Sequence, residues 1–246
     1  MWDNPRQLNA IALMLALAAM AALAWAGVAW VVRQPVFAFH HVVIDGALLR
    51  VNPSHLQAVV QEELRGTFFT MRLADARSSF ARVPWVRQIA LRRQWPDRLE
   101  VTVVEHEPFA RWNDTALVNT HGEVFIASYD GELPQFSGPE GAAGDMAERF
   151  AGFDAALHSI RLSIAEMRLS PRGTWWLKTS GDSPLTIELG RVEPGERLAR
   201  FIAYYARTVG AIVRAGTRID YVDLRYPNGF AARVPDFKEA APKKAT

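Results

Sequence analysis

Three acidic residues are the side chains of this sequence whose type and spacing come nearest to a catalytic group. Glu123, Asp130 and Glu132 could supply the two carboxylates that a glycosidase uses in cleaving a sugar bond. The sequence holds no G-x-S-x-G, Ser-x-x-Lys, Walker A or H-E-x-x-H motif, so the usual signatures of acyl transfer, phosphate binding and zinc catalysis are missing. Because acidic residues are common in turns, we expect these carboxylates to be structural and predict no catalytic residue.

The six histidines could hold a metal ion only where several of them meet. His40 and His41 are consecutive in a predicted strand, so their side chains should point to opposite faces and cannot bind one ion together. His106, between Glu105 and Glu107, is expected to be a solvated turn residue. The sequence has no cysteine, which excludes disulfides and thiolate metal sites. We therefore predict neither a metal nor a cofactor.

The charges are balanced along the chain. Its 246 residues include 28 Lys and Arg against 26 Asp and Glu, a formal net charge of +2, and no segment is a polycation. Proteins that bind nucleic acid usually gather basic residues on one face or in one segment. We therefore do not expect nucleic acid to be a partner.

The N-terminal region is long and apolar enough to cross a membrane. No residue from Gln7 to Val32 carries a formal charge, and the apolar core, 8–32, would span roughly 37 Å as a helix, against a hydrocarbon layer of about 30 Å. Trp25 and Trp30 near its end suit the membrane interface. A cleaved signal peptide is the alternative, because Ala24-Trp25-Ala26 resembles a cleavage site. The length of the stretch favours an uncleaved signal anchor.

Residues 37–107 are expected to form a small α+β unit. Asn52-Pro53 supplies an N-cap and a favoured first helical residue, and Pro96-Asp97 is a turn signal between two apolar strands. The order is β-α-α-β-β, with two helices covering one face of a short sheet. The expected elements are a strand over 39–44, a helix from Pro53 to before Gly66, a short helix that carries Leu73, Ala76 and Phe80 and is stopped by Pro84, and strands over 85–95 and 99–105.

Residues 108–235 are expected to form a second unit that is mainly antiparallel β with helices. Frequent turn signals separate short apolar runs, and a wide apolar stripe follows Pro194. The expected strands cover 116–119, 124–127, 162–170, 174–178, 184–189, 219–226 and 230–234. The expected helices run near 145–158 and from near Pro194 to before Gly216.

The last strand can end in two ways. Pro227 cannot donate a hydrogen bond to a strand ladder, so it belongs at an edge, a bulge or a turn. Either a hairpin forms around Pro227-Asn228-Gly229, or one strand continues through a bulge and leaves an open edge. An open edge offers unpaired N–H and C=O groups to a strand of a partner.

Several motifs resemble the FtsQ/DivIB family of bacterial cell-division proteins. A single span followed at once by a β-α-α-β-β unit is also the layout of this family, in which that unit is a POTRA domain. The matching segments are Gly66-Thr67-Phe68-Phe69, Pro84-Trp85-Val86, the runs 92–99 and 105–112, Gly190-Arg191, the run 196–201, and Tyr221-Val222-Asp223-Leu224-Arg225-Tyr226.

The resemblance implies the fold, the domains and the location. The fold would be a single N-terminal transmembrane helix followed by an α+β POTRA domain and a mainly antiparallel β-domain with helices. The protein would be a single-pass type II protein of the bacterial inner membrane, with a cytoplasmic N-terminus and a periplasmic bulk, at the division septum. The segments would be a cytoplasmic end over 1–7, the helix over 8–32, the POTRA domain over 37–107, the β-domain over 108–235 and a disordered tail over 236–246.

The resemblance also implies partners. In this family the C-terminal edge of the β-domain binds the periplasmic segment of FtsB, within a complex that contains FtsL. Other division proteins would bind through the POTRA domain and the transmembrane helix. By motif position, the contact strand would hold Tyr226, Asn228, Gly229 and Phe230, with Arg172 beside it as a polar contact.

Two classes of function follow. The first is a non-enzymatic scaffold of bacterial cytokinesis that links early division proteins to septal peptidoglycan synthesis through FtsB and FtsL. The second is a signal-anchored cell-envelope hydrolase with a POTRA-like docking module, which would use the carboxylates of Glu123, Asp130 and Glu132. The missing catalytic motifs favour the scaffold.

Overall fold

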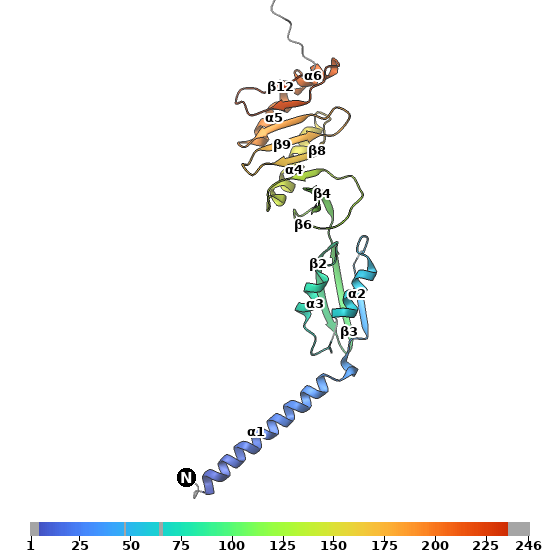
Figure 1. Cartoon of the computed structure of the whole chain (residues 1–246), viewed down its shortest axis with the longest axis vertical. Coiled ribbons are helices and arrows are strands. Elements are labelled where there is room, and N and C mark those ends of the chain that lie inside the picture. Colours follow the sequence, from blue (N-terminus) through green and yellow to red (C-terminus); the bar gives the residue numbers. More distant parts are fainter. Residues whose placement is uncertain (1–4, 47, 64–65, 236–246) are drawn as a thin grey trace, which may run out of the picture. The chain divides into compact units, whose positions relative to one another are not determined.

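A computed structural model describes residues 5–46, 48–63 and 66–235 (Figure 1). The predicted tail and residues 1–4 of the predicted cytoplasmic segment lie outside this range. The first element is the helix α1, Pro5–Val32. Within the described residues, Leu8–Val32 is the one helical stretch long and apolar enough to cross a membrane, and its 25 residues are not buried by the rest of the chain.

The chain divides into two compact units, Met1–Glu105 and His106–Thr246. In the first unit, the short 3-10 helix η1, Pro35–Phe37, leads from α1 into a three-stranded sheet of order β1-β3-β2. The predicted order β-α-α-β-β is confirmed. The elements are β1, His41–Asp45; α2, Pro53–Glu63; α3, Leu73–Phe80; β2, Val86–Gln94; and β3, Arg98–Glu105.

Alternating apolar residues hold the first unit together. β3 lies between a parallel β1 and an antiparallel β2, and its Leu99, Val101 and Val103 are buried, as a strand covered on one face requires. Leu56 of α2 and Phe80 of α3 are fully buried in the same core.

Side-chain caps complete the backbone hydrogen bonds of this unit. The predicted N-cap Asn52 accepts the N–H of Ser54 through Oδ1 at 3.0 Å. At the end of β3, the carboxylate of Glu105 accepts the N–H groups of Leu49, Arg50 and Val51, the last at 2.8 Å. These bonds fix the loop between β1 and α2 to the end of β3.

The second unit is built on a nine-stranded sheet of order β12-β11-β10-β9-β8-β7-β4-β5-β6. Five of its pairings are antiparallel, while β4–β7, β7–β8 and β10–β11 are parallel. Its strands are β4, Pro108–Trp112; β5, Ala116–Asn119; β6, Val124–Phe125; β7, Gln135–Ser137; β8, Ile164–Leu169; β9, Trp175–Thr179; β10, Thr186–Gly190; β11, Tyr221–Asp223; and β12, Ala231–Arg233.

Helices α4, Ala143–His158, and α5, Pro194–Tyr205, pack on this sheet over β8 and β10. They bury one face of the sheet and leave the other open, where Trp176 and Lys178 of β9 lie. The fully buried side chains of this core include Phe136, Met146, Leu157, Met167, Leu177, Ile187, Leu189 and Phe201.

The prediction of a single helix from near Pro194 to before Gly216 is wrong, because the structure has two helices there. α5 ends at Tyr205 and α6, Val209–Arg214, follows after a break. The hydroxyl of Thr208 donates to the carbonyl of Tyr204 at 2.8 Å, a local bond that competes with helical pairing. The break lets Val209 turn into the core, where it is buried.

The predicted strand over 219–226 is also shorter than expected. β11 ends at Asp223, because the carboxylate of Asp223 accepts the N–H of Arg225 at 2.9 Å and turns the chain. Pro227 lies in the following turn, and β12 returns antiparallel to β11. Of the two alternatives for the last strand, the hairpin is therefore confirmed.

Candidate functional site

The three carboxylates considered for hydrolysis do not gather at one place. Asp130 and Glu132 line an open hollow beside Arg111. Glu123 lies in the turn after β5, where its Oε2 accepts the side-chain amide of the buried Asn119 at 2.6 Å. Its carboxylate thus completes the hydrogen bonds of a buried amide.

Two predictions about histidines are wrong. His40 precedes β1 instead of lying in it, so its Nδ1 and that of His41 both approach Oδ2 of Asp97, at 3.5 and 3.2 Å. His106 is half-buried: its ring stacks on Phe125 at 4.1 Å and its Nδ1 lies 2.9 Å from the amide nitrogen of Asn119. These histidines therefore stabilise local structure.

The outer edge of β12 is the candidate site for a partner. β12 ends the strand order of the sheet, and no strand in the described part of the chain pairs with its outer side. All three of its residues, Ala231–Arg233, are exposed. An edge of this kind presents unpaired backbone groups that can accept a further strand.

Side chains hold β12 against the sheet. The guanidinium of Arg233 makes two bonds to the carboxylate of Asp220, at 2.9 and 3.0 Å, and lies 5.6 Å from the ring of Tyr221. The hydrogen bond from Arg233 lowers the pKa of Asp220 below its usual value. Burial, followed by a hydrogen bond to Glu188, raises the pKa of Tyr221 to about 12. These interactions fix β12 in place and leave its outer side uncovered.

The residues predicted as a contact strand lie instead in the loop between β11 and β12. Tyr226, Asn228 and Gly229 are exposed in this loop, with Tyr226 54% exposed. Phe230 is half-buried, and its ring packs edge-on against Phe201 of α5 at 5.4 Å. The prediction of a strand at these positions is wrong because the turn after Asp223 ends the ladder early. The loop still adjoins the open edge, because β12 begins directly after Phe230.

Four arginines surround a hollow near the ends of β10 and β11. Arg172, predicted to lie beside the terminal strand, shares with Arg225 a hollow of about 340 Å³. Sequence reasoning did not single out Arg225 or the other two, although all three fall in segments that resemble the family. The arginines are Arg172, Arg191, Arg197 and Arg225.

A glycine permits this close approach. Gly190 has a φ of +80°, and a Cβ there would lie 2.5 Å from the Nη1 of Arg197 and 3.0 Å from the Cγ of Arg225. The Nη1 of Arg197 instead donates to the carbonyl of Leu189 at 2.9 Å. The small residue therefore lets two cations share one end of the hollow.

Two carboxylates balance part of this positive charge. Arg225 makes a forked pair with Asp223, whose side chain is 8% exposed, with bonds of 2.7 to 3.1 Å. The hydrogen bonds from Arg225 lower the pKa of Asp223 below its usual value. Arg225 also lies 3.4 Å from Glu188, whereas Arg172 and Arg191 are exposed and line the open side of the hollow.

Acidification should remove the stabilisation that this pair supplies. Because the folded pKa of Asp223 lies below its unfolded value of about 4, the contribution is complete above that pH and disappears as the pH falls through the folded pKa. We expect the difference in unfolding midpoint between the native chain and Asp223→Asn to be largest near pH 7 and to shrink below about pH 4. Thermal unfolding followed by circular dichroism measures it. The exposed Asp114→Asn serves as control, and a pH-independent difference for Asp223→Asn would contradict the assignment.

Comparisons with known proteins agree with this architecture. A model described as "POTRA domain, FtsQ-type" matches residues 37–106, and one described as "Cell division protein FtsQ/DivIB, C-terminal" matches residues 110–225. The predicted POTRA domain and the strand-rich domain after it are thereby confirmed.

Three of the relatives cover from 68% to 95% of the chain. Cell division protein FtsQ of Burkholderia pseudomallei is 39% identical over 95% of this chain and 94% of its own length. The protein of that name from Nitrosospira multiformis is 37% identical over 95% of this chain and 99% of its own length. That from Escherichia coli is 34% identical over 68% of this chain and 61% of its own length. The chain therefore belongs to the FtsQ family of cell division proteins.

Proposed function

We propose that this protein is a non-enzymatic scaffold of the bacterial divisome. It would link early division proteins to septal peptidoglycan synthesis by holding the periplasmic segments of FtsB and FtsL. Family membership supports a role in division, and the open edge of β12 is the observation that supports a binding role.

The proposed binding mode is strand addition. A segment of FtsB would pair with the outer side of β12, where its backbone groups would meet those of Ala231–Arg233. The exposed Tyr226 would pack against its side chains, while Asn228 and Gly229 would leave room for its backbone. The arginine hollow would receive an acidic side chain of the partner, because Arg172 and Arg225 line it together.

The proposed location follows from α1. The family and this apolar helix indicate a single-pass protein of the inner membrane. We propose a cytoplasmic N-terminus, both folded units in the periplasm, and recruitment to the septum through the POTRA domain and α1.

Charge reversal in the hollow tests this function. We expect Arg172→Glu, in the full chain reconstituted in nanodiscs, to weaken binding of the periplasmic FtsB segment by about 30-fold or more, since losing one partner of a close charge pair costs about 2 kcal/mol or more. Titration calorimetry measures the affinity. Arg207→Glu, an exposed arginine of the α5–α6 break, should leave binding unchanged. Equal affinities for both variants would place the acidic contact elsewhere, and no binding by the native chain would refute the proposed partner.

A further inference from the structure

Large aromatic side chains are exposed at the end of the first unit that follows α1. Trp95, in the turn between β2 and β3, is 75% exposed, and Phe69 is 49% exposed. The ring of Phe69 lies 5.2 Å from that of Phe37 in η1 and 5.3 Å from that of Phe68. Single exposed aromatic residues are common on protein surfaces, so exposure alone does not indicate a role. The position of these residues relative to α1 supplies the further evidence.

Hydrogen bonds tie the segment that carries Phe69 to the end of α1. The hydroxyl of Thr67, itself buried, donates to the carbonyl of Val32, the last residue of α1, at 2.6 Å. The N–H of Phe68 donates to the carbonyl of Phe37 at 2.7 Å. Only Arg33 and Gln34 separate α1 from η1, so this segment must stay within a few residues' reach of the end of α1.

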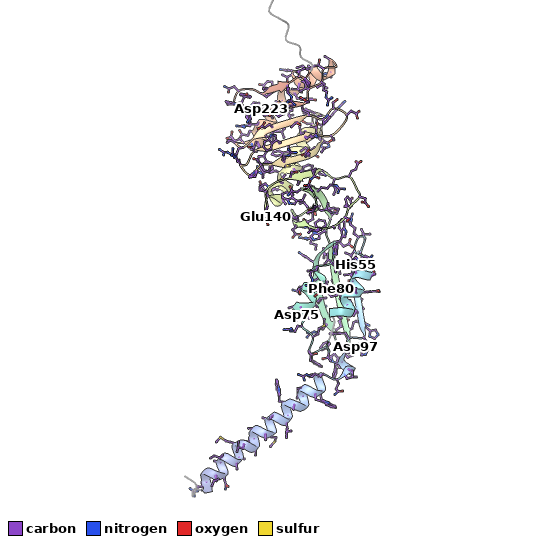
Figure 2. The ribbon with its side chains drawn as sticks, in the orientation of Figure 1. His55, Asp75, Phe80, Asp97, Glu140 and Asp223 are labelled. Atoms are coloured by element: carbon purple, nitrogen blue, oxygen red, sulfur yellow. The ribbon has the colours of Figure 1, made fainter. Side chains whose placement is uncertain are left out.

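The turn that carries Trp95 lies at the same end. The N–H groups of His40 and His41, eight and nine residues after α1, donate to the carbonyl of Asp97 at 3.0 and 3.4 Å. Figure 2 shows Asp97 and His55 at opposite ends of the α/β part of the first unit. Trp95 thus projects from the end of the unit at which the chain leaves the membrane.

We propose that Phe69 and Trp95 insert into the headgroup region of the bilayer that α1 spans and anchor the first folded unit to the lipid surface. Aromatic residues, tryptophan above all, favour this region because their rings are apolar and their edges polar. The exposed Arg33 and Arg98 beside them suit anionic headgroups. The inference requires α1 to cross a membrane but is independent of any protein partner.

An exposed leucine supplies the matched control. Leu49 is 81% exposed, more than Trp95, but its N–H is bonded to Glu105 at the far end of β3. Because β1 and β3 run parallel from His41 and Arg98, Leu49 lies at the opposite end of the sheet from Trp95. Leu49 is thus more exposed than either aromatic residue but lies at the end of the sheet away from α1.

The absence of cysteine makes a direct test possible. Full-length Phe69→Cys, Trp95→Cys and Leu49→Cys chains, each labelled with the fluorophore NBD, would be placed in nanodiscs of phosphatidylethanolamine and phosphatidylglycerol, with or without bromine on the upper acyl chain. We expect a blue-shifted emission and quenching by the brominated lipid at positions 69 and 95, and neither at position 49. Circular dichroism would verify that each labelled chain is folded.

A second variant separates anchoring from mere proximity. In the chain labelled at position 69, where the label replaces Phe69, Trp95→Ser should reduce quenching because it removes the remaining aromatic anchor, whereas Leu49→Ser should not change it. Emission and quenching at positions 69 and 95 equal to those at 49 would overturn the proposal. Quenching at 69 that does not respond to Trp95→Ser would overturn the role of Trp95. The assay contains no partner, so it is unaffected if FtsB fails to bind.

Discussion

Tyr226→Glu is expected to weaken binding of the FtsB segment by about 30-fold or more while leaving the fold intact. Tyr226 is 54% exposed in the loop that leads into β12, so the change removes no core contact. When an aromatic side chain is buried at an interface, its loss weakens the binding free energy by about 2 kcal/mol or more. A glutamate in its place would also add an unpaired charge. Titration calorimetry of the full chain in nanodiscs measures the change, and circular dichroism checks the fold.

The chain offers a matched control for this substitution. Tyr204 of α5 is also 54% exposed but does not lie in the loop beside β12. Tyr204→Glu should bind FtsB as the native chain does. If the two variants bind equally well, the loop is not part of the interface, and the strand-addition site must be sought elsewhere on the protein.

Phe201→Ala is expected to have the largest effect on stability, about 3–5 kcal/mol. Phe201 is fully buried, and the rings of Tyr205 and Phe230 lie 5.5 and 5.4 Å from its own. Removing the ring leaves a cavity in the core and takes away the support of the loop before β12. Urea denaturation followed by circular dichroism measures the free energy of unfolding.

Phe201→Ala should also affect the binding edge. Because Phe230 rests on Phe201, the variant should lose FtsB affinity even under conditions in which it is folded. Tyr204→Ala, exposed on the same helix, should change stability by no more than about 0.5 kcal/mol. A stability loss below about 1 kcal/mol for Phe201→Ala would contradict the packing described here.

Local signals predicted the first unit well. The predicted short helix before Pro84 is confirmed as α3, because its apolar residues recur at helical spacing and a proline cannot continue it. The alternation of Leu99, Val101 and Val103 identified the buried face of β3. In these cases the deciding interactions lie within a few residues of one another.

Interactions between distant segments explain what sequence reasoning missed. The parallel pairing of β10 with β11 joins segments more than 30 residues apart, and no periodicity reports it. Four arginines from separate parts of the sequence line the hollow, and only Arg172 was predicted to lie at the site. The apolar stripe continues without interruption through the break after Tyr205, so it does not predict the break. The local bond at the break is made by a threonine hydroxyl. Likewise, β7 lies in a region without a recognisable pattern.

The shortness of β12 bears on how long a bound strand would stay. Three residues offer few main-chain hydrogen bonds, so an arbitrary extended peptide docked there would dissociate quickly. Only a segment that also engages the neighbouring loop and the arginines would gain a long residence time. If the edge binds a partner as proposed, its shortness would make residence time depend on contacts outside the strand, so that only a segment matching those contacts would stay bound.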